Sequence, residues 1–182
     1  MTQPRVFGRL LPKNDWEGDD GVYTNLTCMD TAAGRALSWA TNGRKDIDGR
    51  KIRAALSPAD RDGVNIEQVR QAVKKLSGQN ILIKRSPGLP LVKTMLGKGA
   101  GLIIWGRYNS LPRSFRHQTG GDFAHAMFAS HRSSSLRAIR IWDPLNPNLE
   151  GHGRWIPEKY VYEFMNDYDY DFGYIPLQPL VV

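Results

Sequence analysis

Helical sequence patterns fill the first half of the chain and strand patterns the second, and this order restricts the fold most strongly. Apolar residues recur at helical spacing from Met29 to Ala40 and again from Ile66 to Leu76. Short apolar runs follow, among them GLIIWG at 101–106 and the pair FAHAMFAS and RAIRIWDP. Helices that precede a group of hairpin-connected strands indicate an α+β fold with an antiparallel sheet.

The chain of 182 residues contains a single cysteine, Cys28, at the start of the first expected helix. Thr27 can cap this helix, with Asp30 as the partner of a short capping box. A helix N-terminus or a neighbouring protonated histidine lowers a thiol pKa from about 8.5 to between about 3.5 and 7.5. Cys28 is therefore a candidate nucleophile, and an unreactive core cysteine is the alternative.

Two further residues have the chemistry that a thiol nucleophile needs, a base and a group that orients it. His125 lies nine residues before Ser134, in a serine-rich turn, and Asp143 lies nine residues after it. A hairpin folded at Ser134 places the two side chains directly opposite each other, with Cβ atoms about 4.5–5.5 Å apart. Taken singly, His125 is explained as a core histidine and Asp143 as a turn residue before Pro144. Together with Cys28 they form a Cys-His-Asp set, which we expect to be catalytic.

The order of these motifs resembles that of papain-like cysteine peptidases, and most closely the compact branch that cleaves double-glycine leaders from bacteriocins. The shared order is a cysteine that opens a helix, an amphipathic helix, the strand LIIWG, a strand with histidine, IRIWDPLNP and RWIPEKYVYEF. The resemblance spans about residues 22–166. It implies a papain-like fold in which the Cys helix packs on a C-terminal antiparallel sheet, with Cys28, His125 and Asp143 as the catalytic triad.

The same resemblance implies a thiol hydrolase that cleaves a peptide or a peptidoglycan-type amide. Two positions depart from the family pattern: Met29 stands where a glycine is usual, and Val22 stands where a glutamine usually helps to hold the oxyanion. Loss of one oxyanion donor typically lowers the rate by about 10²–10³. A catalytically silent papain-fold subunit of a larger assembly, such as a phage virion or tail, is therefore the alternative.

We expect three segments along the chain. These are an N-terminal arm at 1–24, the papain-like peptidase-type domain at 25–166 and a C-terminal tail at 167–182. The arm is polar and aperiodic, and the tail is acidic and aromatic before it becomes apolar. Under the structural alternative, the arm and the tail are the segments that dock on protein assembly partners.

The charge is concentrated in the middle of the chain. Residues 35–98 contain 14 Lys and Arg against 5 Asp and Glu, in a protein of net charge +7. A basic nucleic-acid-binding protein is thus a third hypothesis. We favour a solvated helical face instead, because no aromatic residues interleave with the charges in the way of RNA-binding motifs.

Several other classes are disfavoured. The histidines at 117, 125, 131 and 152 lack the spacing of a zinc site, and we expect no metal and no cofactor. No apolar run approaches the ~20 residues of a membrane span. The N-terminus lacks the apolar stretch of a secretory signal peptide, so we expect synthesis in the cytoplasm, with virion association only under the structural alternative.

Overall fold

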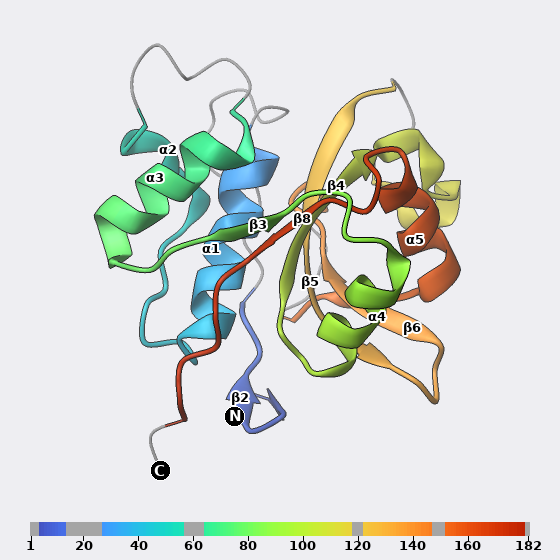
Figure 1. The fold of residues 1–182 in the computed structure, drawn as a ribbon, viewed down its shortest axis with the longest axis horizontal. Coiled ribbons are helices and arrows are strands. Elements are labelled where there is room, and N and C mark those ends of the chain that lie inside the picture. The colour runs from blue at the N-terminus through green and yellow to red at the C-terminus, as the bar shows by residue number, and fades with distance from the viewer. Residues whose placement is uncertain (1–3, 14–26, 57–63, 118–121, 147–151, 181–182) are drawn as a thin grey trace.

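The computed structural model describes residues 4–13, 27–56, 64–117, 122–146 and 152–180 (Figure 1). Within them the helices are α1 (Cys28–Ala40), α2 (Gly49–Ala54), α3 (Ile66–Ser77), α4 (Leu89–Gly97) and α5 (Glu158–Asn166), with short 3-10 helices η3 (Tyr108–Ser110) and η4 (Arg113–Phe115). The strands are β1 (Arg5–Val6), β2 (Arg9–Leu10), β3 (Leu82–Lys84), β4 (Leu102–Arg107), β5 (Ala124–Ser133), β6 (Ala138–Trp142), β7 (Arg154–Pro157) and β8 (Phe172–Tyr174).

The main sheet has six strands in the order β3-β8-β4-β5-β6-β7, and every neighbouring pair is antiparallel. Helices α1 to α3 gather on one side of the molecule, and α4 and α5 lie with the sheet on the other (Figure 1). This arrangement confirms the predicted α+β architecture, with the Cys helix packed on an antiparallel sheet. The tail expected at 167–182 contributes β8, which lies between β3 and β4.

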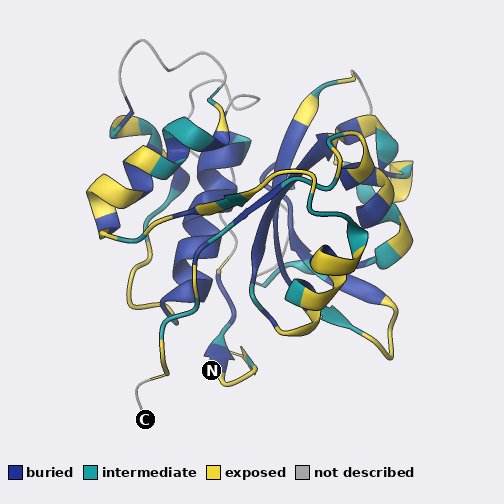
Figure 2. Cartoon of the chain, viewed as in Figure 1, coloured by how far each residue is buried: buried dark blue, intermediate teal, exposed yellow. Residues whose placement is uncertain are grey.

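Two apolar cores hold the layers together. The first packs α1 and α3 against one set of sheet residues, including Ile103 and Phe128. The second packs α4 and α5 against alternate residues of the same strands, including Ile104 and Met127. Helix α1 is therefore enclosed, and Figure 2 shows it buried along its length.

The helix ends follow the local sequence at α3 and depart from it at α1. Asn65 and Gln68 form the capping box of α3, and Gly78 ends that helix in the left-handed conformation at φ 71°. At α1, Thr27 makes no side-chain capping bond, so the predicted capping box is wrong. Its expected partner Asp30 is fully buried and binds Arg53 of α2 instead, with 2.7 Å between Oδ2 and Nε.

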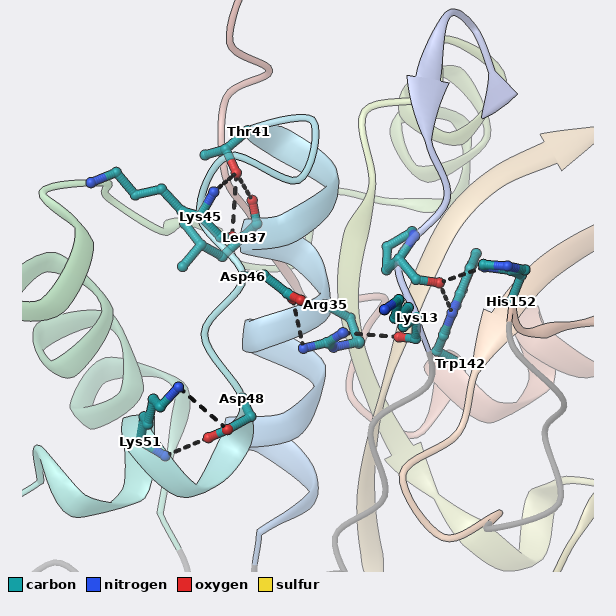
Figure 3. Close-up of polar contacts among 11 residues, drawn as sticks. Lys13, Arg35, Leu37, Thr41, Lys45, Asp46, Asp48, Lys51, Trp142 and His152 are labelled. Atoms are coloured by element: carbon teal, nitrogen blue, oxygen red, sulfur yellow. Dashed lines mark hydrogen bonds and ion pairs between the residues drawn. The ribbon is translucent and has the colours of Figure 1, made fainter. Parts of the chain in front are cut away.

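The described part of the N-terminal arm packs between α1 and the sheet. Arg35 of α1 donates to the backbone oxygen of Lys13 at 2.9 Å. From the sheet side, Trp142 and His152 both donate to the backbone oxygen of Pro12, at 3.1 and 3.2 Å (Figure 3). The arm thus joins the two halves of the molecule through hydrogen bonds to its backbone. Among the helices the structure describes, none is long and apolar enough to cross a membrane.

Candidate active site

Cys28 opens α1, and it is the only one of the thirteen residues of this helix that is not buried. The first N–H groups of a helix have no acceptor within the helix, and they form the positive end of its dipole. The thiol is therefore partly accessible at a position that favours negative charge. Burial of the rest of α1 holds this position fixed.

His125 enters the site from β5, where it pairs with Gly106 of β4 and is 2% exposed. Its Nε2 donates to Oδ1 of Asp143 at 2.7 Å. Its ring also forms a hydrogen bond with the side chain of Cys28. Because Asp143 occupies Nε2, Nδ1 is the ring nitrogen that remains for the sulfur. The structure therefore brings the three predicted residues into one hydrogen-bonded group; their catalytic role remains a prediction.

The route by which Asp143 reaches His125 differs from the expected one. The β5–β6 ladder pairs Phe128 with Trp142. Continued by one residue, this register sets Asp143 beside Met127, two positions from His125. The prediction of direct opposition was thus wrong, and the two side chains meet along the diagonal of the hairpin, which is within reach of long side chains.

A β-bulge explains why the pair still shares a face. The turn occupies residues 134–137, so its centre lies beyond the expected Ser134. The different turn centre alone shifts the pairing between β5 and β6 by three residues from the expected register. A shift by an odd number of residues would put His125 and Asp143 on opposite faces of the sheet. The bulge between Ala129 and His131 takes back one residue. The remaining offset of two leaves His125 and Asp143 on the same face.

The electrostatics of the pair favour its ionised form. Burial opposes protonation of His125, but the Asp143 carboxylate, with a smaller contribution from Cys28, raises the pKa of His125 above its ordinary value. Burial likewise opposes ionisation of Asp143, but His125, the Leu145 N–H and Arg154 hold the pKa of that carboxyl below its ordinary value. At neutral pH the pair is therefore imidazolium and carboxylate.

Sequence reasoning missed Tyr108, which completes the surroundings of Asp143. The Tyr108 hydroxyl donates to Oδ2 of Asp143 at 3.2 Å, and its ring centroid lies 4.8 Å from that of His125. The sequence shows Tyr108 only as an aromatic residue after an apolar strand. The β4–β5 register, which pairs Gly106 with His125, is the signal that could have located it.

The segment after β4 contains η3 and η4 over residues 108–117, and residues 118–121 lie outside the described part. The guanidinium of Arg154 fixes it by donating to the backbone oxygen of Phe115. The segment therefore packs against the sheet beside the site.

Of the two residues that depart from the family pattern, the structure describes Met29 but not Val22. Met29 is buried in the core around α1, at 9% exposure, so it serves packing. The backbone N–H of Cys28 is the donor that the described residues place next to the sulfur.

A second buried histidine shows what a structural imidazole looks like in this fold. His131 stacks on Trp39, with 6.2 Å between centroids, and its Nδ1 lies 2.6 Å from the Ser130 hydroxyl. Burial, together with Arg140, lowers the pKa of His131 to about 4. No carboxylate is among these neighbours, so His131 stays neutral where His125 is protonated. Among the described residues, no three His, Cys, Asp or Glu gather as a metal site.

Comparison with known proteins bears on the fold. No family model matches the sequence, and no curated protein matches it. Among solved structures, the fold is similar to that of a Bacillus anthracis protein assigned as a C39-like peptidase, with a TM-score of 0.59 and 13% identity. The match covers 86% of this chain and 91% of that one. At this identity the likeness shows the fold alone, which is papain-like, as predicted.

Proposed function

We propose that the protein is a cysteine peptidase-like thiol hydrolase, with Cys28 as nucleophile, His125 as general acid and base, and Asp143 as the group that orients the imidazole. The observation that carries this proposal is the hydrogen-bonded group Cys28–His125–Asp143 at the exposed end of a buried helix. The papain-like fold supports it, because this fold accommodates that arrangement in cysteine peptidases.

In the first half-reaction the Cys28 thiolate attacks the carbonyl carbon of an amide. The carbonyl π electrons move to oxygen, and the N–H of Cys28 at the end of α1 supports the oxyanion. The His125 imidazolium then gives its proton to the leaving nitrogen as the C–N bond breaks. An amine leaves, and a thioester to Cys28 remains.

In the second half-reaction neutral His125 takes a proton from water, and the resulting hydroxide oxygen attacks the thioester. The C–S bond breaks, a carboxylic acid is released, and the thiolate–imidazolium pair is restored. Asp143 stays ionised throughout, because its hydrogen bond from Nε2 orients the ring and stabilises its charged form. No redox step or metal enters this sequence.

The substrate is a peptide or protein amide, or a peptidoglycan-type amide. This class follows from the papain-like fold and the triad chemistry. Cys28 is only partly exposed, and an extended chain reaches such a residue more easily than a folded surface does.

The test is cleavage of a blocked peptide library and of purified peptidoglycan fragments, read by mass spectrometry. Wild-type protein should release new amines and acids, and Cys28→Ala, which keeps the helix propensity of the position, should release none. Cleavage that persists in Cys28→Ala would overturn the assignment of the nucleophile. A reactive Cys28 without turnover on any amide would favour the catalytically silent subunit.

A further inference from the structure

We propose that Tyr108 is a positioning residue of the Cys28–His125–Asp143 site, because its hydroxyl fixes the second oxygen of the Asp143 carboxylate. This inference rests on the proposed function. It assigns a role to a buried side chain that neither the motif pattern nor the expected triad includes.

The first step of the argument is the division of labour at Asp143, which is fully buried. Oδ1 accepts from His125 Nε2 at 2.7 Å and from the Leu145 N–H at 3.0 Å. Oδ2 accepts from Tyr108 at 3.2 Å. A carboxylate that accepts hydrogen bonds at both oxygens is held in one orientation, and this restricts the orientation of the imidazole that donates to it.

The second step is the direction of the Tyr108 hydroxyl. Its oxygen accepts from the His117 N–H at 2.8 Å. That bond uses a lone pair, and the ionised Asp143 only accepts, so the Tyr108 proton points to Oδ2. The resulting chain of donors ends on the carboxylate, and each bond strengthens the next.

The third step is the rigidity of Tyr108 itself. Its side chain is fully buried, and its N–H donates to the backbone oxygen of Phe123 at 3.0 Å. Its ring stacks on Phe123, with 5.1 Å between centroids. Because Phe123 lies two residues before His125, the Tyr108 hydroxyl is fixed relative to the strand that holds the imidazole.

The expected consequence is a change in pH dependence as well as in rate. The titratable and charged groups that face the pair among the described residues are Cys28 from α1, Tyr108 from η3 and Arg154 from β7. Without the hydroxyl, the ionised form of Asp143 loses a donor, so Asp143 takes up its proton at higher pH. The pH range in which His125 faces an ionised Asp143 then begins at a higher pH.

The experiment measures the rate of Cys28 alkylation by iodoacetamide between pH 4 and 9 on the full chain. Because Cys28 is the only cysteine in the sequence, all thiol alkylation can be assigned to it. We expect Tyr108→Phe to move the acid limb of the rate profile upward by about one pH unit, so that the rate on that limb falls about tenfold while the rate near pH 7 stays close to that of wild type. The control Tyr174→Phe removes a hydroxyl on β8, where Tyr174 pairs with Leu82 of β3, and should match wild type.

Two results would overturn the proposal: a Tyr108→Phe profile that overlays the wild-type profile, or a uniform loss at every pH without a moved limb, which indicates packing alone. If Tyr108→Phe does not fold, 3-fluorotyrosine at position 108 provides a more acidic donor of nearly the same size. It should move the acid limb downward, and an unmoved limb contradicts the proposal. Failure of the proposed function is recognised separately, since wild-type alkylation would then be insensitive to His125→Ala.

Discussion

His125 donates from Nε2 to Oδ1 of Asp143 across 2.7 Å, although the two residues are offset by two positions in the hairpin that contains them. Both side chains are almost wholly excluded from solvent. An ion pair in such surroundings is favourable only when its remaining polar atoms also have partners. Tyr108 and the Leu145 N–H supply these partners.

The first prediction concerns the charge of Asp143. Asp143→Asn keeps the shape of the side chain but removes the negative charge that stabilises protonated His125 against the effect of burial. The pKa of His125, measured by NMR titration, should therefore fall from above 6.5 in wild type to below 6.5 in the variant. His131 is the internal control, because its pKa of about 4 depends on burial and Arg140. A His125 pKa that is unchanged in Asp143→Asn would contradict the ion pair.

The second prediction concerns Asp30. Burial raises the pKa of this carboxyl from 3.8 to about 7, although the neighbouring charge of Arg53 acts to lower it. Between these two values the folded chain keeps a proton that the unfolded chain has lost. The free energy of unfolding should therefore fall as pH rises from about 4 to about 7, by on the order of 2–4 kcal/mol, and then level off.

The measurement is urea unfolding at intervals from pH 4.5 to 6.5. Asp30→Asn should flatten the slope over this window, even though it lowers stability by leaving Arg53 unpaired. The matched variant Asp46→Asn removes the half-exposed partner of Arg35 and should leave the slope unchanged. Equal slopes in wild type and Asp30→Asn would show that Asp30 is ionised throughout.

The third prediction concerns Gly106, which pairs with His125 across β4 and β5. A Cβ at this position would lie 1.8 Å from the backbone oxygen of Phe164 in α5. A backbone atom cannot move aside cheaply, so Gly106→Ala should lower stability by about 2–3 kcal/mol or more.

Gly97→Ala is the control, since a Cβ built there at the end of α4 would have no atom within 4 Å beyond its chain neighbours and the backbone of its own helix. This change should be neutral or stabilising by up to about 1 kcal/mol. Thermal unfolding of the two variants side by side checks both expectations. A Gly106→Ala protein as stable as wild type would mean that β4 and α5 are not in close contact.

Features of the site that depend on local sequence were predictable. The amphipathic spacing and Asn65 located α3 with its cap, and the apolar run after Thr27 placed Cys28 at the start of α1. These features need only neighbouring residues. The choice of His125 and Asp143 followed from their places in two strands joined by a turn.

Features that depend on distant pairing were not predictable in the same way. The offset of His125 and Asp143 depends on a bulge near Ser130, and no local pattern announces a bulge. Strand β8 lies between β3 and β4, although the sequence marks it only as an acidic, aromatic tail. Tyr108 reaches Asp143 through a contact 35 residues apart in sequence. Such contacts follow from the assembled sheet, which a single sequence does not encode locally.

The most direct test of the central claim is the rate of Cys28 alkylation by iodoacetamide at pH 6, in wild type and in His125→Ala. If sulfur and imidazole form one reactive unit, wild type should react at least about tenfold faster than His125→Ala, because protonated His125 stabilises the thiolate. His131→Ala, which removes the structural histidine, should leave the rate near that of wild type wherever the protein folds. Equal rates in wild type and His125→Ala would contradict the account.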